Sequence, residues 1–108
     1  MDRTKLYNKT RDKKVYYFDI DGTITVETEG WLYLKRTPRW EVINKINALY
    51  DSGEVHIVFW TSRMPIDRRT TEYWFRINGV KYHELIFGKP FFDLYICDKA
   101  INIEQWEK

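Results

Sequence analysis

Short apolar runs divide the chain into predicted strands. Residues 15–18 follow a polar leader and are all β-branched or aromatic, and Val55–Trp60 is a second run that ends abruptly at polar residues. Runs without polar alternation are typical of strands that are buried on both faces of a parallel sheet. Residues 84–87 and 94–97 predict two further short strands.

Apolar residues at helical spacing predict a first helix between the first two strands. Thr37-Pro38 is a common helix start, because proline is tolerated in the first turn. Gly53 ends the helix, since glycine readily adopts the left-handed conformation found at helix C-termini. The positions expected to be buried are Ile43, Ile46 and Tyr50.

A second helix is predicted from about Pro65 to Asn78-Gly79. A short terminal helix is predicted from about Asn102 through Trp106. The face of the second helix that we expect to be buried carries Ile66, Thr70, Tyr73, Trp74 and Ile77.

Residues 23–34 predict a small β-hairpin, which we call the flap. The turn-like residues 27–30 separate Thr-Ile-Thr-Val from Trp-Leu-Tyr-Leu. The order strand, helix, strand, helix, strand, strand is typical of an open α/β sheet with helices on its faces. Ligands of such sheets bind outside the carboxyl ends of the strands, so the residues that follow each strand are candidates for a site.

The composition fits one domain. Of the 108 residues, 44% are hydrophobic and 18% aromatic, which is ample for a core. We expect residues 15–108 to form this domain and residues 1–14, with six Lys or Arg against two Asp, to be a basic leader. No apolar run is long enough for a membrane span or a secretory signal, so we expect a cytoplasmic protein without membrane contact.

Cysteine usage narrows the chemistry. Cys97 is the only cysteine, so no internal disulfide and no cysteine-based zinc site can form. We expect Cys97 to be a small buried hydrophobic residue. Any metal must then be held by oxygen ligands.

Two carboxylates follow the first strand. Asp19 and Asp21 lie two positions apart, and Gly22 permits a tight turn directly after them. Two carboxylates at close range cannot both stay charged without help, so one is protonated or a cation lies between them. Both outcomes suit phosphoryl transfer, in which one aspartate attacks phosphorus and a second carboxylic acid protonates the leaving oxygen.

A phosphoryl group in an acidic pocket requires positive charge. Lys89 is the best candidate, and Mg²⁺ is the second, because it prefers carboxylate and carbonyl oxygens. Asp98, at the end of the fourth predicted strand, would complete a carboxylate set with Asp19. Thr61 and its neighbour Ser62 can donate hydroxyl groups to phosphate oxygens.

These residues fall in a known order. Phe18-Asp19-Ile20-Asp21-Gly22-Thr23 resembles motif I of the haloacid dehalogenase superfamily, and Thr61, Lys89 and Asp98 resemble its motifs II, III and IV. The resemblance covers residues 15 to about 106. Many relatives carry two consecutive acids at motif IV, whereas here the first of these positions is Cys97.

The resemblance implies a three-layer Rossmann-like fold, with a mostly parallel sheet, helices on both faces and a small hairpin flap. It also implies an Mg²⁺-dependent phosphomonoester hydrolase that forms an aspartyl-phosphate. Asp19 would be the nucleophile and Asp21 the general acid and base. The implied metal ligands are Asp19, Asp98 and the backbone carbonyl of Asp21, and Lys89 would both assist catalysis and bind phosphate.

The gaps between the motifs are too short for a cap domain, so the site should be open. An open site favours a large phosphorylated substrate or closure by another subunit in a homo-oligomer. Arg63 and Trp31 are the candidates for contacts with substrate. Among capless relatives the chain looks similar to small bacterial or phage phosphatases, including those found with capsular-polysaccharide genes, and more distantly to the 3′-phosphatase domain of polynucleotide kinase.

The substrate stays open at this stage. A sugar phosphate, a nucleotide or a similar phosphorylated metabolite is the first expectation, and a polynucleotide 3′-phosphate is the alternative, which makes nucleic acid a candidate partner. The third hypothesis is that the chain is a non-catalytic phosphate-binding or receiver-like module. A receiver would place its phosphoacceptor after a middle strand, yet the middle strand here ends in Trp60-Thr61.

Overall fold

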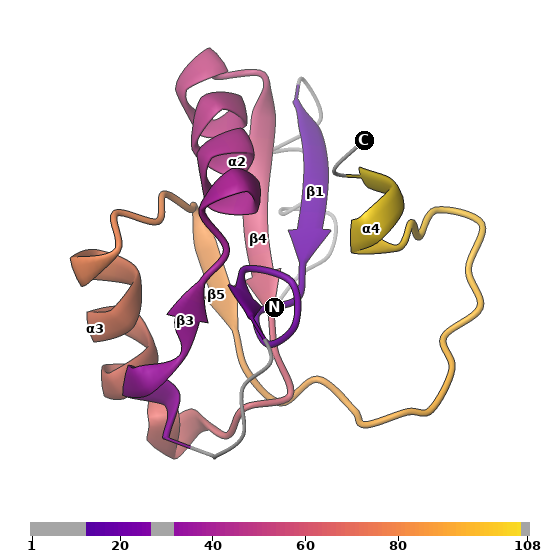
Figure 1. The fold of residues 1–108 in the computed structure, drawn as a ribbon. Helices are drawn as coiled ribbons and strands as arrows, with labels where there is room; N and C mark the ends of the chain where they lie inside the picture. The colour runs from indigo at the N-terminus through magenta and orange to yellow at the C-terminus, as the bar shows by residue number, and fades with distance from the viewer. Residues whose placement is uncertain (1–12, 27–31, 107–108) are drawn as a thin grey trace.

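The computed structural model describes residues 13–26 and 32–106 and has an α/β fold built on a small parallel sheet (Figure 1). Residues 1–12 of the basic leader, the predicted flap turn at residues 27–30 and Trp31 lie outside the described residues.

Three parallel strands form the sheet, in the order β1, β4, β5. They are β1 (Lys14–Phe18), β4 (Val55–Trp60) and β5 (Glu84–Ile86). Phe18 lies opposite Phe59, one residue before the end of β4. All three carboxyl ends therefore lie at one edge of the sheet, and three of the four predicted strands are confirmed.

The fourth predicted strand is wrong. Residues 94–97 form no strand, and every residue from 91 to 102 is exposed (Figure 1). Among the described residues β1 consequently pairs only with β4. This explains a second error: Val15 and Tyr17 are 41% and 51% exposed, so β1 is not buried on both faces, whereas Val55, Ile57, Val58 and Phe59 of β4 are all buried.

The three predicted helices are present, but the two long ones start later than predicted. Helix α2 (Trp40–Ser52) ends at Gly53, whose φ of 74° is left-handed as expected. It starts two residues after Pro38, which belongs to a strand. Helix α3 (Arg68–Ile77) follows the 3₁₀ turn η2 (Pro65–Asp67), and α4 is Ile103–Trp106. No helix in the described ranges is long and apolar enough to cross a membrane.

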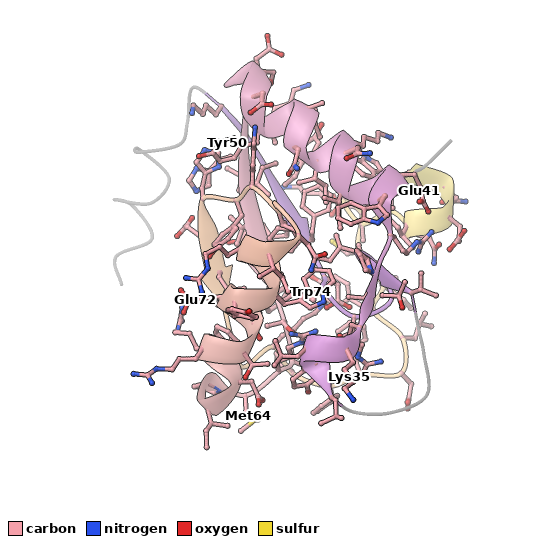
Figure 2. The ribbon with its side chains drawn as sticks, turned by 60° about the vertical axis from the view of Figure 1, so that its left-hand side comes forward. Lys35, Glu41, Tyr50, Met64, Glu72 and Trp74 are labelled. Carbon is pink, nitrogen blue, oxygen red and sulfur yellow. The ribbon has the colours of Figure 1, made fainter. Side chains whose placement is uncertain are left out.

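The predicted face of α3 is mostly wrong. Trp74 is 1% exposed, but Ile66, Tyr73 and Ile77 are 89%, 46% and 55% exposed. The buried side chains of α3 are Thr71, Trp74 and Phe75, of which only Trp74 was predicted. Figure 2 shows Trp74 pointing into the molecule from this helix, while the exposed Glu72 points away.

The core lies between the sheet and the two long helices. Ile57 and Phe59 share one face of β4, because side chains alternate along a strand, and both belong to the cluster that α2 and α3 contribute to. Both long helices therefore cover the same face of the sheet (Figure 2). For the described residues, the expectation of helices on both faces is wrong. The buried members of the cluster are Phe18, Ile20, Ile24, Val42, Ile43, Ile46, Val55, Ile57, Phe59, Trp74, Phe75 and Val80.

The flap differs from the predicted hairpin. Strand β2 (Thr25–Val26) pairs antiparallel with β3 (Thr37–Pro38), and Tyr33–Lys35 forms the 3₁₀ turn η1 between them. Thr37-Pro38 is therefore a strand partner and not a helix start, since the backbone N–H of Arg39 is bonded to the carbonyl of Ile24 at 2.8 Å.

Candidate active site

The loop after β1 is a hydrogen-bonded turn that contains two buried isoleucines. Ile20 and Ile24 are both fully buried, and the backbone N–H of Ile24 donates to the carbonyl of Ile20 at 3.0 Å. Gly22 has a φ of 83°, which disfavours any side chain, and its N–H donates to the Thr25 hydroxyl at 3.1 Å. The turn predicted from Gly22 is confirmed, and it fixes the backbone of both Asp19 and Asp21.

Asp19 is a partly buried carboxylate among charged neighbours. Its Oδ1 accepts the backbone N–H of Ile20 at 2.9 Å. Burial raises the pKa of Asp19, and the nearby positive charge of Lys89 and the Ile20 hydrogen bond act in the opposite direction. The charge of Asp21 adds to the rise, and that of Arg63 opposes it. The structure thus brings Asp19, Asp21 and Lys89 within electrostatic reach of one another.

Asp21 is held by an arginine fork. The Arg63 Nε donates to Asp21 Oδ2 at 3.0 Å, and Nη2 donates to Oδ1 at 2.7 Å. The Nε of Arg36 lies 3.7 Å from the same Oδ1. About a third of the Asp21 side chain, 34%, remains exposed. Paired, parallel N–H···O bonds of this kind fix the plane of a carboxylate as well as its position.

Arg63 itself is buried, which sequence reasoning did not foresee. It is 2% exposed, and its Nη1 donates to the hydroxyl of Thr71 on α3 at 3.0 Å. The guanidinium carbon lies 3.9 Å from the centroid of the Tyr33 ring. As placed, Arg63 contacts Asp21 and the core rather than an open surface, which differs from the substrate contact that we predicted for it.

Backbone hydrogen bonds join the segments that follow β4 and β5. The backbone N–H of Lys89 donates to the carbonyl of Thr61 at 2.9 Å, and that of Gly88 donates to the carbonyl of Arg63 at 3.3 Å. The Thr61 Oγ1 accepts the backbone N–H of Arg63 at 3.1 Å and is almost fully buried. Its own hydroxyl proton is left for another acceptor. Ser62 is half-buried.

A cavity of about 600 Å³ lies next to Asp19. Its walls are β1, the loop residues Asp19 and Thr23, and part of the exposed segment 95–101. The Nζ of Lys89 lies 5.1 Å from the centre of the Trp60 ring, and both residues line the cavity. The cavity therefore places the carboxylate of Asp19 and two lysines, Lys89 and Lys99, beside apolar and aromatic walls.

The predicted magnesium ligands are not gathered. Asp98 lies in a turn within the exposed residues 91–102, where its Oδ1 accepts from the Cys97 thiol at 3.7 Å. Within residues 13–26 and 32–106, no three His, Cys, Asp or Glu side chains form a group that could hold a metal ion. As described, Asp98 does not complete the carboxylate set with Asp19 that the predicted Mg²⁺ site requires. Cys97 is exposed, so the expectation that it is buried is wrong.

The sequence did not predict the contacts that three residues make with Asp21 and Arg63. Tyr33 and Thr71 hold the guanidinium of Arg63, and Arg36 approaches Asp21 directly. Their positions along the chain are typical of surface loops and helix faces, so no local signal distinguished them. A buried arginine is recognised only once its carboxylate partner is placed.

Comparison with known proteins supports the fold. No family model matches the chain, and no curated protein matches it. A crystal structure of a target protein from Vibrio cholerae is similar, with a TM-score of 0.70 and 27% identity over 87% of each chain.

Two structures of the Pnkp1/Rnl/Hen1 complex, one described as an RNA repair complex, contain chains of similar fold. The TM-scores are 0.61 and 0.62, and the identities are 17% and 18%. The matches cover 70% and 88% of this chain but 25% and 33% of those chains. The α/β fold described here thus recurs as a minor part of much larger proteins.

Proposed function

We propose that this chain is a phosphomonoester hydrolase of the haloacid dehalogenase kind, in which Asp19 is the nucleophile and Asp21 the general acid and base. The observation that carries the proposal is the electrostatic environment of Asp19. It is a partly buried carboxylate at a strand end, close enough to Asp21, Lys89 and Arg63 for all three to act on its ionisation. Sites with two carboxylates in different surroundings suit paired nucleophile and acid roles.

The first half-reaction forms a bond between Asp19 and phosphorus. A carboxylate oxygen of Asp19 attacks the phosphoryl group while the bond from phosphorus to the ester oxygen breaks. Protonated Asp21 gives its proton to that oxygen, which leaves as an alcohol. Lys89 offsets the negative charge of the phosphoryl oxygens, and the Thr61 hydroxyl donates to one of them.

The second half-reaction returns the site to its starting state. Asp21, now a carboxylate, takes a proton from a water molecule as the water oxygen attacks the phosphorus of the aspartyl-phosphate. The bond from phosphorus to Asp19 breaks, inorganic phosphate leaves, and Asp21 is again protonated. The balance is one phosphomonoester and one water in, one alcohol and one phosphate out.

Mg²⁺ dependence is part of the proposal, although the described residues do not form its site. Asp19 lies at the site, but Asp98 lies in the exposed segment and must approach Asp19 for the carboxylate set to form. Bound Mg²⁺ would supply positive charge beside the phosphoryl oxygens. The steps above are assigned to side chains alone.

The test is phosphate release from an aryl phosphate, measured with and without Mg²⁺. Asp19→Asn should lower the rate to background, because the amide is not a nucleophile. Asp51→Asn is the matched control, since Asp51 is an exposed aspartate of α2 whose described partner is Lys81. Full activity of Asp19→Asn would exclude the proposed mechanism.

A polynucleotide 3′-phosphate is the second candidate substrate. The chains of similar fold that belong to the Pnkp1/Rnl/Hen1 complex favour it, because one of these structures is described as an RNA repair complex. A panel of 3′- and 5′-phosphorylated oligonucleotides, sugar phosphates and nucleotides should separate the two substrate classes by kcat/KM. A preference of at least about tenfold for 3′-phosphorylated ends, a difference of 1.4 kcal/mol, would assign the polynucleotide role.

A further inference from the structure

We infer that Arg63 is a positioning residue, which orients the Asp21 carboxyl group for proton transfer and does not itself contact substrate. The inference rests on the proposed function, in which Asp21 exchanges a proton with the leaving oxygen and with water. Arg63 is a buried charge to which the steps proposed above give no role.

The geometry of the fork is the first argument. Nε and Nη2 of Arg63 donate to the two different oxygens of Asp21, at 3.0 and 2.7 Å. Two parallel bonds from a planar group remove the rotation of the carboxylate about its own axis, which a single bond from lysine would leave open. Each carboxylate oxygen keeps a further lone pair, so Asp21 can still carry and deliver a proton.

Arg63 is itself held in one position. Its Nη1 donates to Thr71 at 3.0 Å, and its guanidinium lies over the Tyr33 ring at 3.9 Å. Its backbone N–H donates to Thr61, which ties the main chain of Arg63 to the end of β4. The side chain is 1% exposed. A surface arginine would lose this precision to side-chain motion, whereas Arg63 transmits the rigidity of α3 to Asp21.

The unequal exposure of Asp21 and Arg63 distinguishes this pair from a purely structural ion pair. The Asp21 side chain is 34% exposed, whereas that of Arg63 is 1% exposed. One partner is therefore embedded, and the other faces outward from a turn whose backbone is already fixed by Gly22 and the buried Ile20. An embedded arginine that holds an accessible carboxylate is the arrangement that orients a proton donor.

The experiment compares two leaving groups. Dinitrophenyl phosphate releases a weakly basic oxygen that needs no proton from Asp21, whereas phenyl phosphate releases a more basic one. Arg63→Lys keeps the positive charge near Asp19 but loses the fork. We expect its kcat/KM, which reports formation of the aspartyl-phosphate and not the water step that both substrates share, to fall about 10²-fold on phenyl phosphate, the scale of general acid catalysis. On dinitrophenyl phosphate kcat/KM should fall by less than about threefold.

A second pair of variants covers the case in which Arg63→Lys does not fold. Thr71→Val removes the acceptor of Nη1 without touching Asp21, and should show the same leaving-group dependence at about tenfold, within the usual range for a lost positioning contact. Thr71→Ser keeps the hydroxyl and should restore the activity. Arg76→Lys is the matched control on α3, because Arg76 is exposed and its described contact is the Tyr73 ring.

The outcomes divide cleanly. Equal losses of kcat/KM on both substrates in folded Arg63→Lys or Thr71→Val, or no loss of kcat/KM on phenyl phosphate, would overturn the positioning role while leaving the proposed function intact. Full activity of Asp19→Asn would overturn the proposed function, and the positioning role would fall with it. Loss on phenyl phosphate alone, with rescue by Thr71→Ser, supports both.

Discussion

The backbone N–H of Lys89 donates to the carbonyl oxygen of Thr61 at 2.9 Å. This bond joins the loops that follow two neighbouring strands, and the charge of Lys89 acts on Asp19, which follows the third strand. The main chain of the residue that supplies this positive charge is thus anchored to the end of β4.

Replacement of Lys89 should change both the rate and its pH dependence. Asp19 must be ionised to attack phosphorus, and Lys89 lowers the pKa of Asp19 against the effect of burial. Lys89→Ala should therefore move the acid limb of kcat/KM to higher pH, and lower kcat by about 10²-fold through the lost phosphoryl counter-charge.

Lys89→Arg keeps the charge and serves as the control for this limb. It should leave the acid limb close to that of the wild-type protein. The measurement is kcat/KM for an aryl phosphate between about pH 4 and pH 8, a range that begins near the ordinary pKa of aspartate. An acid limb that does not move in Lys89→Ala would show that Lys89 does not act on Asp19.

Asp19→Asn should stabilise the folded protein. Burial raises the pKa of Asp19 above its ordinary value, so the folded state favours the protonated carboxyl. This preference contributes fully to stability at pH values below the pKa that Asp19 has in the unfolded protein. The contribution is lost as the pH rises through the pKa that Asp19 has in the folded protein. At pH above both values the wild-type protein carries the cost of a desolvated charge, which asparagine removes.

The measurement is urea unfolding at two pH values. The gain of Asp19→Asn over wild type should be larger near pH 8 than near pH 4, where a larger share of the wild-type carboxyl is protonated. Asp51→Asn, in an exposed ion pair, should show no such gain. A variant that is less stable than wild type at pH 8 would contradict the effect of burial on Asp19.

The strand-end residues could be predicted because their signals are local. Asp19 and Thr61 directly follow apolar runs, and Gly22 adopts the left-handed conformation that its place in the turn requires. The buried face of α3 could not be predicted, because the buried Thr71 is bonded to Arg63, a residue outside the helix. The helical spacing of Tyr73 and Ile77 is equally regular, and only the tertiary contact decides which face turns inward.

The strand predicted at residues 94–97 failed for a related reason. Its composition favours a strand, but a strand requires a partner, and in the structure this segment does not pair with β1. The exposure of Val15 and Tyr17 follows directly, since both had been expected inside the sheet. One missing pairing therefore accounts for the exposed edge strand and for the separation of Asp98 from Asp19.

Two isoleucines test the packing of the helices. Ile46 of α2 is fully buried, whereas Ile77 of α3 is 55% exposed, although the sequence pattern predicts both inside. Ile46→Ala should cost about 2–5 kcal/mol of unfolding free energy, and Ile77→Ala less than about 0.5 kcal/mol. Chemical denaturation of both variants checks this. Equal costs would mean that the face of α3 predicted from the sequence is the buried one.

Cys97 tests the exposed segment directly, because it is the only thiol of the chain. We expect an aromatic disulfide reagent to label the native protein within about tenfold of the rate for the urea-unfolded protein, since an exposed thiol has no barrier to attack beyond its ionisation. Cys97→Ser gives the blank. Protection of more than about 10²-fold, equivalent to 2.7 kcal/mol of opening free energy, would show that residues 94–97 pack in solution, as the sequence predicts.

The activity of the labelled protein extends the same experiment to the site. Cys97 and Asp19 line the same cavity, so a bulky mixed disulfide at Cys97 should lower phosphatase activity, and reduction should restore it. Cys97→Ser, treated with the same reagent, should keep its activity because nothing is attached. Unchanged activity of the fully labelled protein would place the segment away from the substrate path, and Asp98, its neighbour in the chain, would then lose its case as a ligand beside Asp19.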